Sequence, residues 1–384
     1  MRKTLLTAAS LTALMLSGTA HAAKPLIKVT LLGTGVPLLN ANALEINDRA
    51  LSGLLVEAGS ERILFDCGQG VYRRLLEVKA ADLDKTDPPF QPSVLNPYIW
   101  VDKVFISHLH SDHIADLAAL YSLGALYRHP EATDLGFTED LKKYPFPTTT
   151  PLKVWGPSAG PNQPVGTWAM MQSLRNAYES DFYVRALWAY DPVTGQNTWD
   201  ASVGYPSVDT INNTTELTDG AVYKLDNGAR ITAFTVNHEP VTPSYGFRVD
   251  YKGHSVVYSG DTAPTPNIIK YGKNVDVLVH EVYGYARDDS TNIYDYHTST
   301  EDAANIFKQT KPKQAVFTHL VIPPGTSADD LVTRTTQAGY KGKLKAGTDL
   351  MVITVNDDNT VKVKEPANAK ATNARKARGR FAEM

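Results

Sequence analysis

Short apolar runs rich in β-branched residues recur along the chain, and turn residues separate them, which predicts β-strands. The predicted strands cover 27–32, 54–56, 62–65, 103–106, 230–234, 255–258, 275–279, 314–317 and 351–354. Helical patterns predict helices over 71–79 and 300–309, the second with Ser299 or Thr300 as its N-cap. Strands that alternate with helices in both halves indicate a layered α/β fold.

The pattern changes between about residues 129 and 228, where apolar periodicity is weak and Pro, Gly, Asn, Thr and Tyr are frequent. This texture predicts an insertion. Its large aromatic residues predict either a small aromatic cluster within the insertion or an aromatic wall for a substrate. These residues are Tyr183, Trp188, Tyr190, Trp199 and Tyr205.

The two ends of the chain differ from the domain between them, residues 23–365. Residues 1–22 begin with Met1-Arg2-Lys3, continue with an apolar run and end in small residues, which predicts a secretory signal cleaved after Ala22. The apolar run is shorter than the ~20 residues of a membrane span, so we expect no span after cleavage and a periplasmic or secreted protein. Residues 366–384 are rich in Ala, Lys and Arg without apolar periodicity, which predicts a disordered basic tail.

Composition narrows the range of partners. The formal net charge of the 384 residues is −3 and the basic residues are dispersed, which argues against a nucleic-acid partner. Cys67 is the single cysteine, so no intramolecular disulfide can form. Since no activating group stands near Cys67 in the sequence, we expect a small buried side chain and not a nucleophile.

Candidate metal ligands gather directly after the strand predicted at 103–106. His108, His110, Asp112 and His113 lie within the segment 108–113, where a loop can direct them toward one point. Histidine and carboxylate together suit a zinc-type ion. Further candidates follow later strands: His238, Asp261 and His319.

From Leu32-Gly33-Thr34-Gly35 to Thr318-His319-Leu320, this succession resembles the metallo-β-lactamase superfamily, and within it the ribonuclease Z-like branch. The resemblance implies an α/β fold, a four-layer αββα sandwich with the metals at one edge. It also implies two Zn²⁺ or other divalent ions. His108, His110 and His238 would hold one ion, Asp112, His113 and His319 would hold the other, and Asp261 would bridge them.

Two further motifs carry the resemblance to the ribonuclease Z-like branch, His280-Glu281-Val282 and Tyr296-His297-Thr298-Ser299. The implied catalytic residues are Asp112, Glu281 and His297. A hydroxide that bridges the metals would attack a tetrahedral ester, Asp112 would orient it, and His297 beside Glu281 would protonate the leaving group.

The spacing between two ligands bears on the substrate. Ribonuclease Z proteins that process transfer RNA generally carry a long basic arm between the residues that match His238 and Asp261, but here only 22 residues separate them. We therefore predict an exported phosphodiesterase acting on a small ester, with aromatic esters among the candidates. The main alternative is an arylsulfatase. Two less favoured alternatives are a lactonase or β-lactamase, and a non-catalytic zinc-binding scaffold. Because proteins of this superfamily often dimerise, a homodimer is a candidate state. His129 and His254 have no matching role and are predicted to be surface or structural residues.

Overall fold

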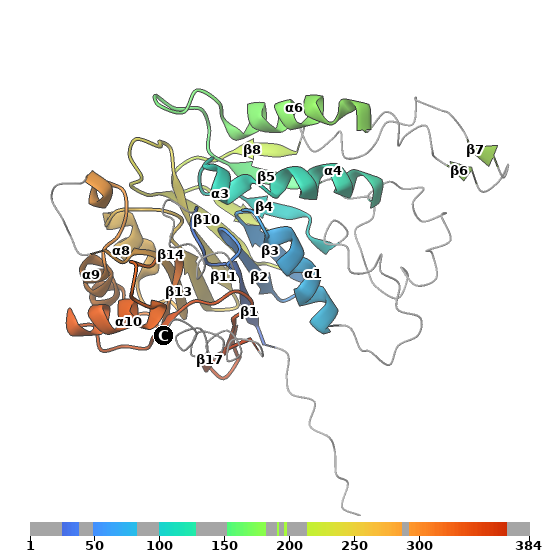
Figure 1. Cartoon of the computed structure of the whole chain (residues 1–384). Coiled ribbons are helices and arrows are strands. Elements are labelled where there is room, and N and C mark those ends of the chain that lie inside the picture. The colour runs from blue at the N-terminus through green and yellow to red at the C-terminus, as the bar shows by residue number, and fades with distance from the viewer. Residues whose placement is uncertain are drawn as a thin grey trace, which may run out of the picture.

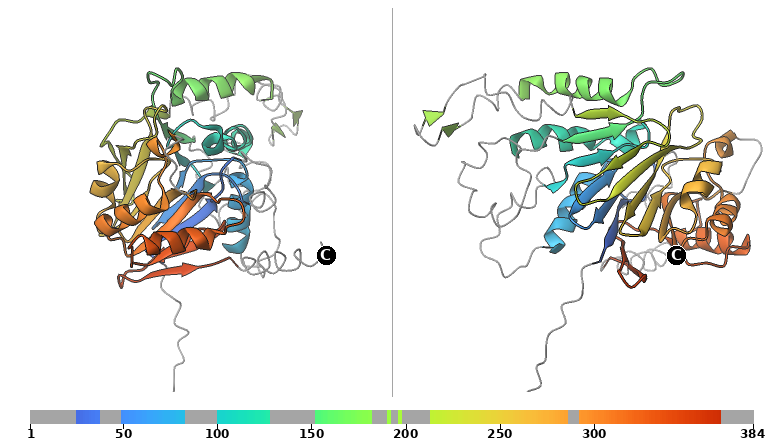
Figure 2. Two further views of the ribbon diagram at one scale, coloured as in Figure 1. Left: turned by 60° about the vertical axis from the view of Figure 1, so that its left-hand side comes forward. Right: turned by 180° about the vertical axis from the view of Figure 1, so that it is seen from behind.

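The computed structural model describes residues 25–37, 49–82, 100–127, 152–181, 190–191, 196–197, 213–285 and 292–366. Within these ranges two large β-sheets pack face to face, with helices on both outer faces (Figure 1). In the left view of Figure 2, the orange helices lie on one side of the sheets and the blue and teal helices on the other. The predicted four-layer αββα sandwich is confirmed. Within the described part of the chain, no helix has both the length and the apolar character of a membrane crossing.

The first sheet has eight strands and contains both the beginning and the end of the domain. Its order is β17 (Val361–Lys364), β16 (Val352–Val355), β1 (Ile27–Gly33), β2 (Gly53–Ala58), β3 (Glu61–Phe65), β4 (Lys103–Phe105), β5 (Lys153–Gly156) and β8 (Thr214–Glu216). From β17 to β3 neighbouring strands are antiparallel, and from β3 to β8 they are parallel. The carboxyl ends of β3, β4 and β5 therefore share one edge.

The second sheet has seven strands. Its order is β15 (Leu344–Ala346), β14 (Gln314–Val321), β13 (Val277–Tyr283), β12 (His254–Tyr258), β11 (Tyr245–Tyr251), β10 (Arg230–Thr235) and β9 (Val222–Lys224). Strands β12 to β15 are parallel, and β10 has the same direction because β11 is antiparallel to both β10 and β12. A separate ribbon pairs β6 (Tyr190–Asp191) with β7 (Gln196–Asn197).

Helices cover the outer face of each sheet. On the eight-stranded sheet these are α1 (Val71–Asp82), α4 (Leu117–Tyr127) and α6 (Thr167–Ala177), with the single turn α3 (Ser111–Ile114) before α4. On the seven-stranded sheet they are α8 (Pro266–Gly272), α9 (Thr300–Thr310) and α10 (Ala328–Gln337), and a 3₁₀ turn, η5 (Asn292–Asp295), precedes α9. Ser299 is the N-cap of α9, and its side chain accepts a hydrogen bond from the backbone N–H of Asp302.

Strand β3 shows why the sequence signals for this fold are continuous apolar runs. Ile63 and Phe65 are buried between the two sheets, whereas Leu64 is buried under the helices of the eight-stranded sheet. Successive side chains of a strand point to opposite faces, so a strand covered on both faces needs apolar residues throughout. Each such side chain contributes roughly 1.5–3 kcal/mol when it is fully buried.

Part of the stretch expected as an insertion belongs to the sheets. Within 129–228, β5 and β8 extend the eight-stranded sheet, β9 extends the seven-stranded sheet, and α6 packs on β5 and β8. These strands have three or four residues, too few for a clear alternating pattern, so the sequence did not reveal them. The predicted signal at residues 1–22 and all but the first residue of the tail predicted at 366–384 lie outside the described residues. So do His129 and the side chains of the predicted aromatic cluster.

Candidate metal centre

The predicted site residues meet at one edge of the sandwich, where parallel strands end. Asp261, Glu281 and His319 lie at the carboxyl ends of β12, β13 and β14, and His238 follows β10. The segment 108–113 follows β4 of the opposite sheet, at the edge where β3 and β5 also end. Because loops after parallel strands converge at one edge, residues far apart in the sequence become neighbours there.

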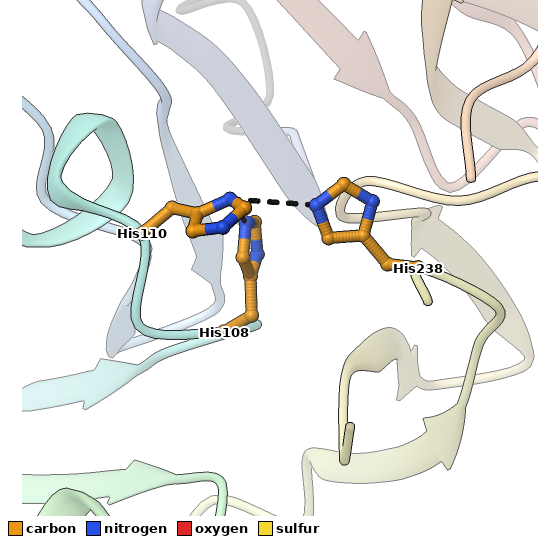
Figure 3. A group of neighbouring side chains, drawn as sticks. All are labelled: His108, His110 and His238. Atoms are coloured by element: carbon orange, nitrogen blue, oxygen red, sulfur yellow. Dashed lines mark hydrogen bonds between the residues drawn. The ribbon is translucent and has the colours of Figure 1, made fainter. Parts of the chain in front are cut away.

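Three imidazoles form the first group (Figure 3). His110 Nδ1 lies 3.0 Å from His108 Nε2 and 3.4 Å from His238 Nε2. His108 and His238 are buried and His110 is exposed, so the group is open to solvent on the side of His110.

Asp112, His113 and His319 form the second group, and all three are buried. Asp112 Oδ2 lies 3.4 Å from His113 Nε2 and 3.3 Å from His319 Nε2. Asp261 Oδ2 lies 3.4 Å from His113 Nε2, 3.2 Å from His319 Nε2 and 3.9 Å from His108 Nε2. The Asp261 carboxylate therefore stands between the two groups.

An irregularity in β14 determines the direction of the His319 side chain. Glu281 pairs with Thr318 and Val282 pairs with Leu320, so His319 is an extra residue between two pairs. Its φ is 45°, a left-handed conformation that is rare for residues other than glycine. Such a bulge redirects a side chain that would otherwise follow the alternation of the strand.

A second layer of contacts orients the imidazoles. The buried Asp66 carboxylate accepts hydrogen bonds from His113 Nδ1 (2.8 Å), Tyr258 Oη (2.7 Å) and Ser107 Oγ (2.8 Å). Ser107 Oγ in turn lies 3.0 Å from His108 Nδ1 and can accept its proton. When Nδ1 of a histidine donates in this way, Nε2 keeps a free lone pair, which both rings direct toward the centre.

Glu281 and His297 lie beside the two groups. Glu281 is fully buried, and its Oε1 accepts a hydrogen bond from Thr262 N (2.6 Å) and lies 2.9 Å from His297 Nδ1. The ligand atoms of Glu281, His297 and His319 lie within 4.8 Å of one another. Glu281 and His297 therefore lie at the same site as the predicted metal ligands.

Burial and charge set the protonation of these groups. Burial lowers the pKa of His108, and the neighbouring His113 lowers it further, so neutral imidazole is favoured. Burial opposes ionisation of Asp261, yet His319 and His113 hold the pKa of that carboxyl well below its usual range. Burial also opposes protonation of His297, but the Glu281 carboxylate raises the pKa of His297 to about 9.

The residues fit a pair of divalent cations. A tetrahedral zinc ion with bonds of about 2.0–2.1 Å places its ligand atoms roughly 3.3–3.5 Å apart. Of the distances above, those from Asp112 Oδ2 to His113 and His319, from Asp261 Oδ2 to His113, and from His238 to His110 fall in this range, at 3.3–3.4 Å. Asp261 Oδ1 and His319 Nδ1 are buried without a hydrogen-bond partner among the described residues, a costly state for polar atoms.

Comparison with known proteins agrees with this geometry. The family model described as a Beta-lactamase superfamily domain matches residues 187–320. A ribonuclease Z of Mycolicibacterium gilvum is 29% identical over 339 residues, which cover 86% of this chain and 97% of that protein. A ribonuclease Z of Mycobacterium marinum is 28% identical over 86% of this chain and 99% of that protein.

Solved structures show the same architecture. The metallo-β-lactamase fold protein YhfI of Bacillus subtilis superposes with a TM-score of 0.52 at 20% identity, over 85% of this chain and 98% of that one. Zinc-bound PqqB of Methylobacterium extorquens superposes with a TM-score of 0.50 at 13% identity, over 85% of this chain and 99% of that one. The protein therefore has the metallo-β-lactamase fold. Over most of its length, its sequence is also similar to those of the two ribonuclease Z proteins.

Sequence reasoning missed the residues that support the imidazoles, chiefly Asp66 and Tyr258. Asp66 follows the predicted strand 62–65, so it carried the same signal as the other site residues, a polar group after a buried strand. Two other expectations are confirmed. Cys67 is fully buried, and His254 is a buried structural residue whose Nδ1 lies 3.2 Å from Asp276 Oδ2.

Proposed function

We propose that this protein is an exported hydrolase with two divalent metal ions, zinc in the first place, that cleaves small phosphodiesters. The pairing of Glu281 with His297 at the edge of the two ligand groups carries the proposal. A phosphodiester has a leaving oxygen that must receive a proton.

The residues of each group define how the ions would be held. His108, His110 and His238 would hold one ion, Asp112, His113 and His319 would hold the other, and Asp261 would contact both. When bound, two such ions supply positive charge for the ester oxygens and activate water as the nucleophile. Asp112 reaches His113 and His319 through Oδ2, which leaves Oδ1 for hydrogen bonding to the attacking water.

His297 would act as the general acid. Its Nδ1 is held by Glu281, so Nε2 is the nitrogen that can face a substrate. Thr262 N donates a hydrogen bond to Glu281 Oε1, which holds the carboxylate that orients the imidazole. A positioned acid of this kind contributes typically about 10²–10⁴-fold to the rate, and most for poor leaving groups.

The interval between His238 and Asp261 favours a small substrate over transfer RNA. The intervening residues 239–260 form a short loop, β11, a two-residue turn and β12. Both strands are internal strands of the seven-stranded sheet, so this interval has no room for a protruding arm. The formal net charge of −3 also does not favour binding of a polyanion.

The experiment starts from the mature chain. Metals are counted by mass spectrometry, and hydrolysis of bis(p-nitrophenyl) phosphate, p-nitrophenyl sulfate and a precursor transfer RNA is measured in the same preparation. We expect about two zinc ions per chain and metal-dependent turnover of the phosphodiester. Faster turnover of the sulfate would establish the arylsulfatase alternative, and cleavage of the RNA would replace the small-ester proposal.

Two variants distinguish loss of the metal centre from a general loss of folding. Asp261→Ala removes the carboxylate between the two groups, so both metal content and turnover should fall. Asp329→Ala changes an exposed carboxylate in the first turn of α10 and serves as the matched control. Turnover that survives Asp261→Ala, or binding of two ions without hydrolysis of any ester, would refute the proposed hydrolase.

A further inference from the structure

Two tyrosine rings flank the proposed general acid. The Tyr283 ring is stacked on the His297 ring, with centroids 6.0 Å apart and planes at 19°. The Tyr296 ring lies 5.0 Å from the His297 ring and 5.7 Å from the His238 ring. Both tyrosines are partly exposed, whereas Glu281 and His238 behind them are buried.

The backbone at both tyrosines is fixed to the site. Tyr283 is the last residue of β13, and its N–H donates to the carbonyl of Thr298, next to His297. The carbonyl of Tyr296 accepts a hydrogen bond from His238 Nδ1 at 2.9 Å. Each ring is therefore held in place by the segments that carry the site residues, and does not depend on a free loop for its position.

Within the described part of the chain, the hydroxyl groups of the two rings form no hydrogen bonds. There, neither Tyr283 Oη nor Tyr296 Oη has a hydrogen-bond partner, in contrast to Tyr258 and Tyr294, whose hydroxyls donate to Asp66 and to the carbonyl of Tyr285. Tyr283 packs instead against the rings of Tyr285 and Tyr294, at 5.5 Å from each. Partly exposed rings without polar partners offer apolar, polarisable faces to a ligand.

We propose that Tyr283 and Tyr296 bind the leaving group of the substrate, and that this leaving group is aromatic, a phenol joined directly to the ester oxygen. The inference rests on the proposed function, because it requires His297 to protonate that oxygen. A leaving oxygen at hydrogen-bond distance from His297 Nε2 brings a directly attached ring to the two tyrosines. An aliphatic alcohol at the same place would gain much less from them.

The reaction has a simple balance. Water adds its hydroxyl to phosphorus, the bond between phosphorus and the phenolic oxygen breaks, and that oxygen takes the proton of His297. The second proton of the water restores His297. The products are a phenol and a phosphate monoester, and the tyrosines act only by positioning the phenolic ring.

The test compares two diesters that differ in the leaving group alone. Methyl phenyl phosphate and methyl hexafluoroisopropyl phosphate have leaving groups of similar acidity, but only the first has a ring. The measured quantity is the ratio of kcat/KM for the phenyl ester to that for the hexafluoroisopropyl ester, followed by ³¹P nuclear magnetic resonance with the metal-loaded full domain.

The variants are Tyr283→Leu, Tyr296→Leu and Tyr283→Phe. Loss of an aromatic contact changes the ratio by about two- to tenfold. We therefore expect the ratio to fall by that factor in each leucine variant and to be largely retained in Tyr283→Phe. Tyr271→Leu is the matched control, because Tyr271 is also partly exposed and stacked on another ring, Phe234, but lies on α8 away from His297. Its ratio should equal that of the wild type.

The outcomes separate this inference from the proposed function. If the wild type hydrolyses neither diester, the proposed phosphodiesterase fails. If it hydrolyses both and the leucine variants keep the wild-type ratio, the function stands and the aromatic leaving group is refuted. A fall of equal size in Tyr283→Phe would assign the effect to the hydroxyl and would also overturn the stacking role.

Discussion

Replacing Asp66 by Asn tests whether the second layer of the centre controls its metal affinity. The Asp66 carboxylate accepts hydrogen bonds from Ser107 N, Ser107 Oγ, His113 Nδ1 and Tyr258 Oη, at 2.7 to 2.8 Å. In Asn an NH₂ group replaces Oδ2 and faces the last three donors. The hydroxyls of Ser107 and Tyr258 can rotate, but His113 can accept a proton at Nδ1 only by carrying its own proton on Nε2. Nε2 then has no lone pair for the centre.

The size of the effect follows from the two roles of Asp66. Loss of a residue that orients a metal ligand typically costs about 10–100-fold in metal affinity. At about 1.4 kcal/mol for each factor of ten, this equals roughly 1.4–2.8 kcal/mol. The buried Tyr258 hydroxyl also loses an ionised acceptor, so we expect the free energy of unfolding of the metal-free protein to fall by about 1–3 kcal/mol.

Zinc affinity would be measured by competition with a chromophoric chelator, and unfolding by urea titration of the metal-free protein. Asp276→Asn is the matched control, because Asp276 is also a buried partner of a histidine, His254, but at the opposite ends of β12 and β13. This variant should lose stability and keep its zinc affinity. Unchanged zinc affinity in a folded Asp66→Asn variant would refute the argument from the tautomer of His113.

Three further predictions concern parts of the fold outside the ligand groups. Asp349 accepts hydrogen bonds from Thr34 N (3.0 Å) and Ala50 N (2.7 Å) and forms an ion pair with Arg74 (3.2 Å). Because Asp349→Ala removes the carboxylate from this largely buried ion pair, it should lower the free energy of unfolding by about 3–5 kcal/mol in urea titration. A loss below about 1 kcal/mol would contradict this. Burial raises the pKa of the Cys67 thiol, and the nearby Asp116 and Asp66 raise it further. This thiol should react with Ellman's reagent at pH 8 only after unfolding, and rapid labelling of the native protein would show that it is accessible. Ser299→Ala removes the N-cap of α9 and should cost about 1 kcal/mol by thermal unfolding, an expectation that an unchanged Tm would overturn.

Local sequence signals predicted much of the fold. The runs Ile63–Phe65 and Ala315–Phe317 are apolar at every position because both faces of each strand are covered, and they lie in β3 and β14. Strands without such a signal were missed. Strand β5 has four residues and β9 has three, and β9 alternates between exposed and partly exposed positions, so their place depends on pairing with β4 and β10.

The sequence by itself determined which residues are available to a metal centre. The cluster 108–113 is compact enough to be recognised locally, and the later polar residues follow apolar runs that predict strands. Only the tertiary structure decided how these residues meet. The bulge at His319, the support of His113 by Asp66 and the tyrosines beside His297 all depend on pairing between segments far apart in the chain. The physical reason is that a local sequence pattern indicates only whether a residue is buried or exposed. The distance between two side chains depends on strand register and packing, which many distant residues determine together.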